Sequence, residues 1–532
     1  MRLCVRSGNL FMKRREFIYL LTALPAAASA FGITHYETSK RVYPGKNGKL
    51  VYVPDENGNT IPDFSNCGYM GGGVRLPDVP VRITIEPGDG DAAPRIQAAI
   101  DKVAAMAPDK DGFRGTVLLT KGRFKVGSTI QIASGGIVLR GEGDGENGTV
   151  LVATQRKQHT LIEIKGKFFA KTSGVSRRIT SNYVPVGSRT FKLENSTGLR
   201  PGDRVVVRRK GNANWIHEIG MDRITVRPAD PEGTKQWEPF DLDFDRTVTA
   251  VNGDQVTVDA PIVCAIEQRW GGGEVWPVDT GGRIANIGVE NLRGDSEFDA
   301  SVKLEEADAG KYSADEQHAW TFISFDAVEN AWVRDITAVH FGYTAVNIGR
   351  SKWITVQDSR CIEMVSEITG SRRYPFHISN GQLCLVQRCE TVTARHAFVV
   401  GSRVCGPNVF LDGKAINSFN SSEPHHRWSV GGLYDNISAE IAFQDRQWMG
   451  SGHGWAGANY VAWNCEGPLV CQRPPTAQNW AIGQVGEKRP GAFAPRPDGY
   501  WESLGKHVTP RSLYLQQLQD RLGNIAVKNI SR

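Results

Sequence analysis

The chain has 532 residues, of which 40% are hydrophobic and 23% are charged, so it is long enough for a large core or for several ordinary domains. Its formal net charge is +6, but five basic residues and one acid lie in residues 1–30, and the rest of the chain carries only +2. So small an excess of positive charge is not expected of a nucleic-acid-binding protein. Glycine is abundant, with 58 residues against 26 prolines, which favours many tight turns between short strands.

The first thirty residues have the pattern of an export signal. A Lys-Arg-Arg cluster at 13–15 precedes an apolar run that ends in Ala-Ser-Ala at 28–30, and a charged start, a short apolar stretch and a small-x-small site are typical of such signals. The adjacent arginines resemble a twin-arginine signal. We therefore expect a periplasmic or secreted protein without an integral membrane segment once the signal is removed, the alternative being a buried N-terminal helix.

A short amphipathic helix and a series of short strands follow. Asp91 is placed to cap a helix with Pro94 in its first turn, and Ile96, Ile100 and Val103 share one of its faces. Three β-branched runs separated by glycine come next, at residues 115–126, 129–132 and 136–143. Because no helical pattern lies between them, they predict strands joined by turns.

The middle of the chain breaks this pattern. Residues 185–265 hold alternating strand-like segments, and the Asn252-Gly253 step between two of them is a hairpin signal. We predict a small antiparallel β subdomain here, inserted into the surrounding fold. Its segment 214–222 is aromatic and polar, and either overhangs a groove or packs against the rest of the protein.

Strand endings of the form apolar-x-Asp/Asn/Arg recur in the second half of the chain. Their first residues are separated by 44, 23, 30, 24 and 52 positions, which approximates multiples of one coil of roughly 22–26 residues with inserted loops. The six first residues are Val289, Val333, Val356, Val386, Phe410 and Ala462. A period of this size is typical of a solenoid whose coils bury one another's faces. Leucines at 513, 515, 518 and 522 predict a C-terminal helix that seals or flanks the solenoid.

The Gly-Thr-Val…Gly-x-Phe-x-Val pair at 115–126 and the Val-Leu-Arg-Gly-Glu-Gly turn at 138–143 resemble the pectate-lyase-like superfamily. This resemblance implies an all-β, right-handed parallel β-helix (solenoid) with an N-terminal capping helix and an inserted antiparallel β subdomain. The expected parts are an export signal (1–30), an N-terminal extension (31–80), N-terminal coils (81–184), the inserted subdomain (185–265), the main β-helix with the active site (266–475) and a C-terminal tail and helix (476–532). Such scaffolds carry lyases, hydrolases, transferases, epimerases and non-catalytic adhesins, so the resemblance implies architecture rather than reaction.

Imidazole and guanidinium groups gather in one part of the predicted β-helix. Between Arg360 and Arg427 there are eight basic residues against five acids, and four of the eleven histidines fall within fifty residues. Stacked coils bring residues one coil apart to within about 4.8 Å, so these groups can converge on one face. The segments Arg395-His396 and His425-His426-Arg427-Trp428 are the strongest candidates.

These residue types suit a lyase that acts on a uronic-acid polymer, which must neutralise a carboxylate, remove the C5 proton and protonate the oxygen that leaves C4. We assign neutralisation to Arg395 and Arg427, the base to His396 or His425, and the acid to Tyr343 or His426. The further substrate-binding candidates are Trp428, His377, Arg373, His340, His453 and Trp455. For each histidine taken singly, a structural or surface role is the alternative.

The sequence thus predicts a monomeric lyase that cleaves an acidic polysaccharide by β-elimination, without a cofactor and without a metal site. The alternatives are a glycoside hydrolase or transglycosylase on the same scaffold, and a non-catalytic glycan-binding β-helix. The element Gly452-His453-Gly454 resembles that of polygalacturonase-type hydrolases, but their Asp-Asp pair and Arg-Ile-Lys are missing, as is the Trp-x-Asp-His motif of calcium-dependent pectate lyases. Eight cysteines follow residue 30 without any Cys-x-x-Cys pair, so we expect small core residues, with a disulfide left open.

Overall fold

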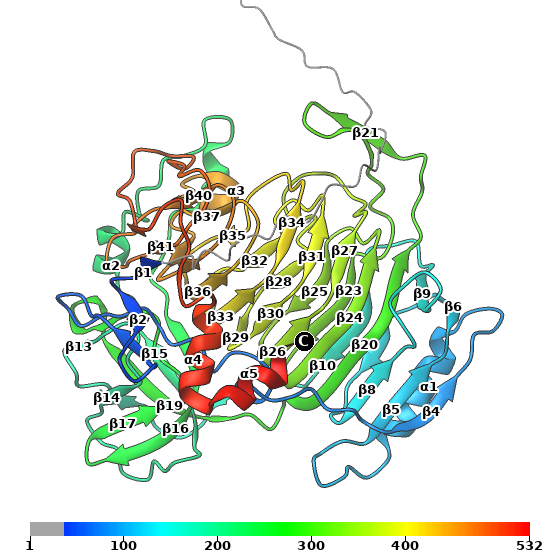
Figure 1. The fold of residues 1–532 in the computed structure, drawn as a ribbon, viewed down its shortest axis with the longest axis horizontal. Helices are drawn as coiled ribbons and strands as arrows, with labels where there is room; N and C mark the ends of the chain where they lie inside the picture. Colours follow the sequence, from blue (N-terminus) through cyan, green and yellow to red (C-terminus); the bar gives the residue numbers. More distant parts are fainter. Residues whose placement is uncertain (1–36, 532) are drawn as a thin grey trace, which may run out of the picture. The chain divides into compact units, whose positions relative to one another are not determined.

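Parallel strand pairing between successive turns of the chain organises the fold. The computed structural model describes residues 37–531, so the predicted export signal lies outside the described residues. The chain is mostly β, with two large parallel sheets that run side by side along the molecule (Figure 1). Each sheet gains one strand, or one short pair of strands, with every coil. These pairings define a parallel β-solenoid, and its right-handed sense remains a prediction.

The wide sheet pairs all its strands in parallel. Its strands are β4 (Val81–Ile85), β5 (Gly115–Leu119), β6 (Gly122–Val126), β8 (Ile137–Arg140), β9 (Thr149–Ala153), β20 (Ile284–Ser296), β24 (Val328–Val339), β26 (Ser351–Gln357), β27 (Arg360–Ile362), β29 (Gly381–Gln382), β30 (Leu385–Gln387), β31 (Glu390–Val392), β33 (Cys405–Leu411), β34 (Lys414–Ile416), β36 (Ser429–Asp435), β38 (Gly457–Ala458), β39 (Val461–Trp463), β41 (Trp480–Ile482) and β42 (Tyr500–Glu502).

The narrow sheet positions the candidate site. In chain order its strands are β7 (Ile130–Ile132), β10 (Thr160–Lys165), β23 (Thr321–Asp326), β25 (Thr344–Ile348), β28 (Phe376–Ile378), β32 (Phe398–Val400) and β35 (Glu423–Pro424), and each pairs with the next in parallel. A parallel pair of β37 (Ile441–Phe443) and β40 (Leu469–Cys471) follows. One apolar core fills the space between the two sheets along the coils.

The register confirms the repeat and explains its irregular intervals. Val333 pairs with Val356, Val356 with Val386, and Val386 with Phe410. The interval of 44 is a single coil, since Val289 pairs directly with Val333, and it is long because this coil carries the hairpin β21 (Lys303–Glu306) and β22 (Gly310–Ser313). The interval of 52 contains two coils, because Tyr434 pairs with both Phe410 and Ala462.

The expected helix near the start is α1 (Ala93–Ala104). Asp91 Oδ1 accepts a hydrogen bond from the backbone N–H of Ala93 at 2.9 Å, and Ile96, Ile100 and Val103 are buried against the first coils. The helix therefore covers the apolar interior at this end of the solenoid, as predicted.

An antiparallel sheet forms the middle of the chain and is larger than the predicted range 185–265. Its strands are β11 (Lys171–Thr172), β12 (Arg177–Arg178), β14 (Thr190–Lys192), β15 (Arg204–Arg209), β16 (Leu242–Asn252), β17 (Gln255–Val258) and β19 (Gly273–Asp279). A short antiparallel pair, β13 (Tyr183–Val184) and β18 (Ile266–Glu267), accompanies it. The hairpin signal at Asn252-Gly253 is confirmed, because Asn252 pairs with Gln255 and Gly253 has φ 59°.

A buried ionic cluster attaches this antiparallel sheet to the wide sheet. Lys352 of β26 is fully buried and its Nζ lies 2.7 Å from Asp245 of β16, which also pairs with Arg283. Burial alone would raise the pKa of Asp245, but the two cations hold that pKa below its usual value. The cluster therefore places a carboxylate of one sheet between cations from two neighbouring segments.

The segment 214–222 packs against the solenoid instead of overhanging a groove. It contains α2 (Ala213–Glu218), whose Trp215 is buried with its ring centroid 5.2 Å from that of Trp428. The indole N–H of Trp455 donates to the carbonyl of Ile219 at 3.2 Å. Together these residues form a second apolar core, which joins the antiparallel sheet to the later coils.

The C-terminal segment forms α4 (Leu513–Leu522) and α5 (Asn524–Ile530), which lie against the outer face of the wide sheet (Figure 1). The helix thus flanks the coils, the second of the two predicted arrangements. Asp435 of β36 is fully buried and accepts hydrogen bonds from the Ser512 hydroxyl at 2.7 Å and the Tyr514 N–H at 2.9 Å. Burial raises the pKa of Asp435 to about 7.

The N-terminal segment packs on the same face as α4 and α5. It contains β1 (Glu37–Thr38), which pairs with β43 (Val508–Thr509), and the hairpin β2 (Val42–Pro44) and β3 (Leu50–Tyr52). The hydroxyl of Tyr514 donates to the carbonyl of Cys67 at 2.7 Å. The two distant ends of the described chain therefore hold each other on one sheet face.

Two general properties complete the fold. All eight cysteines of the described residues are buried and free, so the structure assigns them to the core and forms no disulfide among them. Within residues 37–531, none of the helices combines the length and apolarity that crossing a membrane requires.

Candidate functional site

A cavity of about 740 Å³ lies beside the narrow sheet, and we call it the histidine pocket. Its lining is dominated by cationic and aromatic side chains. These are Arg227, Arg395, Arg427, Arg446, His377, His425, His426, His453, Tyr343, Tyr374 and Trp448. The other described residues that line it are neutral, so the wall contains four arginines and no carboxylate.

Consecutive coils of the narrow sheet present these side chains. Tyr343 immediately precedes β25, His377 lies in β28, and His425 follows β35. The backbone N–H of Tyr374 donates to the carbonyl of Tyr343 at 2.7 Å, which fixes the two rings with centroids 5.5 Å apart. Stacking of the coils therefore gathers residues that are 30 or more positions apart in sequence.

Two tyrosine–histidine pairs face the pocket. The hydroxyl of Tyr343 lies 2.7 Å from Nδ1 of His377, and the hydroxyl of Tyr374 lies 2.9 Å from Nε2 of His425. Arg395 donates from Nη1 to the Tyr374 hydroxyl at 3.0 Å. One pair therefore touches a fixed cation, whereas no cation within residues 37–531 is in hydrogen-bond contact with the Tyr343 hydroxyl.

The imidazoles of the pocket are neutral at physiological pH. Burial, followed by the neighbouring arginines, lowers the pKa of His426 to about 4 and that of His453 to about 2. Burial, with a smaller effect from His426, lowers the pKa of His377 to about 3. The positive charge of the pocket is therefore carried by its arginines, and the histidines offer neutral donors and acceptors.

The connection between α2 and β16 and the turn at 449–453 complete the wall. Arg227 donates to the carbonyl of Gly450 at 2.9 Å and lies 5.4 Å from the ring centroid of Trp448. The indole N–H of Trp237 donates to the carbonyl of Gly452 at 2.9 Å, within the short helix α3 (Met449–Gly452). The inserted segment thus supplies one of the four arginines and holds the turn that leads to His453.

One group beneath the pocket has the spacing of a metal site. His396, Glu423 and His425 each offer a ligand atom, and these atoms lie within 4.8 Å of one another. Glu423, however, accepts from Arg446 Nη1 and from the Ser421 hydroxyl at 3.0 Å, and His425 Nε2 faces the Tyr374 hydroxyl. A cation here would displace these contacts and meet the charges of Arg395 and Arg446, so we assign no metal to this group.

The structure brings seven of the predicted site residues together in the pocket: Tyr343, His377, Arg395, His425, His426, Arg427 and His453. Arg427 is held at the rim, where its Nη2 donates to the Ser451 hydroxyl at 2.7 Å. His425 is placed differently from the prediction, because both of its ring nitrogens already face other side chains, Tyr374 and His426. It therefore cannot take a substrate proton directly.

Five predicted site residues lie elsewhere, and each correction has a physical reason. His396 is fully buried and its Nδ1 faces the carbonyl of Ser421 at 2.7 Å, so it supports the pocket floor and is not the base. Arg373 is buried and donates to the carbonyl of Ser366. His340 lies between two carboxylates outside the pocket, Asp295 at 2.8 Å and Glu363 at 3.3 Å.

The two predicted groove tryptophans are core residues. Trp428 is fully buried and Trp455 is 4% exposed, and both belong to the apolar core that joins the antiparallel sheet to the coils. Trp448, for which no role was predicted, is half-buried and lines the pocket.

Sequence reasoning missed Tyr374, Arg446 and Arg227. Tyr374 had a usable signal, since it lies 31 positions after Tyr343 and one coil of this region spans 30. Arg446 lies less than one coil beyond Arg427, the last residue of the segment that is rich in basic residues. For Arg227 we find no signal, because its approach to the pocket depends on how the inserted segment folds back.

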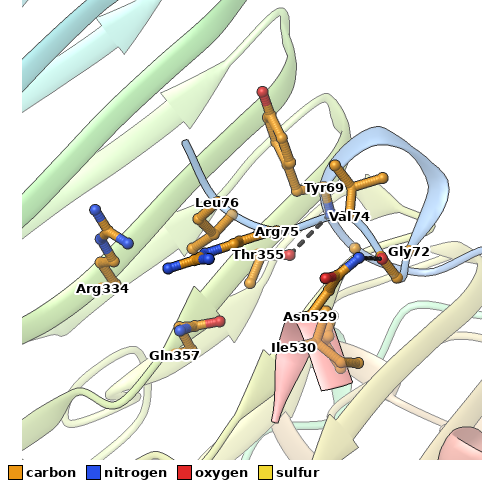
Figure 2. A pocket seen from close by; sticks show the side chains of 13 residues that line it. Tyr69, Gly72, Val74, Arg75, Leu76, Arg334, Thr355, Gln357, Asn529 and Ile530 are labelled. Carbon is orange, nitrogen blue, oxygen red and sulfur yellow. Dashed lines mark hydrogen bonds between the residues drawn. The ribbon is translucent and has the colours of Figure 1, made fainter. Parts of the chain in front are cut away.

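A second, smaller cavity lies between the N-terminal segment and α5 (Figure 2). Arg75, Arg334 and Gln357 line it, and the guanidinium of Arg334 is paired with Glu290 at 2.6 Å. Its volume of about 110 Å³ is below the roughly 300–1,000 Å³ of ordinary ligand pockets. The histidine pocket is therefore the better candidate for a functional site.

Comparison with known proteins adds similarity of fold only. No protein-family model and no curated protein matches the sequence. Among solved structures, the tailspike protein gp49 of Pseudomonas phage LKA1 aligns with a TM-score of 0.43 at 13% identity, over 74% of this chain and 56% of that one. The Gp54 tailspike of Acinetobacter baumannii bacteriophage AP22, solved with a capsular saccharide, gives 0.42 at 12% identity, over 75% and 56%. DFA-IIIase from Arthrobacter chlorophenolicus gives 0.34 at 8% identity, over 77% and 73%.

The chain thus spans a little over half the length of these two tailspikes. The pectate-lyase-like resemblance is not among these findings and remains a prediction. What the chain shows by its own strand pairing is a parallel β-solenoid with an arginine- and histidine-lined pocket.

Proposed function

We propose that the chain is a polysaccharide lyase that cleaves an acidic, uronic-acid-containing glycan by β-elimination. The observation that carries this proposal is the composition of the pocket wall, which has four arginines, four histidines and two tyrosines and, among the described residues, no carboxylate. Arginine binds carboxylates with a fixed charge and a planar set of donors. An anionic sugar therefore suits this wall better than a neutral one.

The same wall favours elimination over hydrolysis. Glycoside hydrolysis generally uses two carboxyl groups on opposite sides of the scissile bond, and the described lining supplies neither. Glu423 lies beneath the pocket, fully buried and engaged by Arg446 and Ser421. Elimination needs a neutralised carboxylate, a base and an acid, for which the pocket has arginine, tyrosine and histidine side chains.

The accessible arginines and the first tyrosine–histidine pair support specific roles. Arg427 and Arg227 at the rim bind the substrate carboxylate, which makes the C5 proton more acidic. Tyr343 takes that proton on its hydroxyl oxygen while its own proton passes to Nδ1 of His377 at 2.7 Å. The electrons of the C5–H bond form the C4=C5 double bond, and the C4–O bond breaks with its pair on oxygen.

The export pattern at residues 1–30 supports placing this activity in the periplasm or outside the cell. We propose that the chain acts as a monomer.

The test is incubation of the purified protein with a panel of polyuronides and neutral glycans. We expect at least one polyuronide to give the ultraviolet absorbance of an unsaturated sugar, and neutral glycans to give none. The Tyr343→Phe variant should lose about 10²-fold or more in kcat with an unchanged melting temperature. New reducing ends without that absorbance would make the protein a hydrolase, and binding without either signal would make it a non-catalytic glycan-binding protein.

A further inference from the structure

A line of hydrogen-bond contacts runs through the second tyrosine–histidine pair and ends in the pocket. Arg395 Nη1 lies 3.0 Å from the Tyr374 hydroxyl, which lies 2.9 Å from His425 Nε2. His425 Nδ1 lies 3.3 Å from Nδ1 of His426. Nε2 of His426 makes no hydrogen bond to any residue within 37–531, and His426 lines the pocket.

The donors at one end fix the direction of the whole line. A guanidinium only donates hydrogen bonds, so Arg395 donates to the Tyr374 oxygen, and the backbone N–H of Ser371 donates to the same oxygen at 3.3 Å. The hydroxyl hydrogen of Tyr374 is then left for His425 Nε2. A neutral His425 consequently carries its hydrogen on Nδ1 and donates it to Nδ1 of His426, which leaves the hydrogen of His426 on Nε2.

We propose that Tyr374 and His425 form a directed proton relay, supported by Arg395, that makes Nε2 of His426 the acid which protonates the departing oxygen. This inference rests on the proposed β-elimination, and it assigns His426 as a catalytic residue and Arg395, Tyr374 and His425 as positioning residues. It also separates the two tyrosines of the pocket, since Tyr343 acts on the C5 proton and Tyr374 acts through two imidazoles on the leaving group.

The relay balances without leaving a charge on either imidazole. When the C4–O bond breaks, the oxygen keeps the electron pair and takes the hydrogen of His426 Nε2. The Nδ1 hydrogen of His425 moves to His426, and the hydroxyl hydrogen of Tyr374 moves to Nε2 of His425. The negative charge that remains on the Tyr374 oxygen is held by Arg395 and the Ser371 N–H.

The protein's proton count is restored by the other half of the reaction. The pair of Tyr343 and His377 has gained the C5 proton, so the substrate takes one proton and gives one. After the product leaves, one proton from water enters at His426 and returns the relay to its starting state, and His377 releases its extra proton to water.

The surroundings of His426 favour an acid that stays neutral at rest. Its neighbours among charged and titratable groups are Arg403, Arg427, Arg446, His377, His425 and His453. Arginines on several sides oppose a resting imidazolium. A relay that delivers a proton only as the oxygen becomes basic avoids that repulsion, because each imidazole gains one proton while it loses another.

The experiment compares two leaving groups on the uronic acid that the wild-type protein cleaves. One substrate is the natural oligosaccharide, whose alcohol leaving group needs protonation, and the other carries 4-nitrophenoxide at C4, which leaves without it. For His426→Gln we expect kcat on the oligosaccharide to fall by about 10²–10⁴-fold with little change in KM, and kcat on the nitrophenyl substrate to fall by less than about tenfold. Tyr374→Phe should show the same selective loss, with a smaller magnitude.

The matched control is Thr369→Ala, which alters an exposed residue of the pocket wall that has no part in the proposed machinery. It should leave the ratio of the two rates unchanged, and all variants should melt at the wild-type temperature. Equal losses on both substrates in His426→Gln or in Tyr374→Phe would overturn the relay while leaving β-elimination intact. A wild-type protein that forms no unsaturated product from any polyuronide would instead overturn the proposed function, and the relay with it.

Discussion

At the scale of single residues, burial decides what each histidine of the cluster does. His396 and His426 look alike in sequence, since each is next to an arginine within the basic segment 360–427. His396 is fully buried with Nδ1 on a backbone carbonyl, whereas His426 keeps a ring nitrogen in the pocket. The sequence predicted the histidine cluster because residues that lie about one coil apart come together when the coils stack. It could not say which imidazole lies beneath the floor, because the period does not fix the direction of a side chain in the bends between strands.

Asp435 is a second residue whose environment governs its chemistry, and it gives a prediction about stability. Burial raises its folded-state pKa from 3.8 to about 7. The protonated form is therefore favoured in the folded protein, so its contribution is fully present below about pH 4 and is lost as pH rises through 7. The shift corresponds to roughly 4 kcal/mol.

The Asp435→Asn variant should remove this dependence while keeping an oxygen acceptor for Ser512 and Tyr514. We expect the free energy of unfolding of the variant, relative to wild type, to rise between pH 4 and pH 8. Urea unfolding at several pH values measures it. A difference that stays constant across that range would contradict the raised pKa of this carboxyl group.

At the scale of elements, the strands were more predictable than their connections. The runs at 115–126 and 129–132 became β5, β6 and β7 because β-branched residues between glycines suit short strands. The coil period could be detected because the apolar-x-polar endings of successive strands occupy paired positions in the sheet. Tyr434 was overlooked although Tyr434-Asp435-Asn436 has the same apolar-x-polar ending, and it falls in the middle of an interval of two coils.

The contact between the antiparallel sheet and the wide sheet depends on buried charge, which gives a prediction for Lys352. In Lys352→Met, Asp245 loses one of its two cations inside the protein. Breaking a buried ion pair costs up to about 3–5 kcal/mol, and here Asp245 stays buried with Arg283 as its remaining cation. We expect that loss in the free energy of unfolding, measured by chemical denaturation.

The control for this variant is Lys192→Met, which breaks the exposed pair with Asp254 at 3.8 Å. Exposed pairs contribute about 0–1 kcal/mol, so the control should unfold almost as wild type does. Comparable losses in the two variants would show that burial of Lys352 has no special effect.

At the scale of the whole molecule, the pocket is the joint product of the coils and the inserted segment. The coils supply three of its arginines and both tyrosines, and their meeting was predictable from the repeat. The insertion supplies Arg227 and holds the turn at 449–453. That part could not be predicted, because it depends on tertiary packing around Trp215 and Trp237 and not on any local pattern.

The cysteines of the molecule lead to a prediction about its stability in reductant. All eight thiols of the described residues are buried and unpaired, so no disulfide among them restricts the unfolded chain. We expect the full chain to have the same melting temperature with and without excess dithiothreitol. The same should hold for Cys4→Ser, which removes the ninth cysteine, the one outside the described residues. A lower melting temperature in dithiothreitol would mean that a disulfide forms in the native protein.

The contacts between the two ends of the described chain affect the order of folding during synthesis. The hydroxyl of Tyr514 reaches the carbonyl of Cys67, 447 positions earlier, and Gln517 contacts Phe64 in the same region. A ribosome releases the N-terminal coils long before it has made α4, and N-terminal parts generally fold first. The part of the outer face that α4 and α5 cover therefore stays exposed on the nascent chain until those helices have been made.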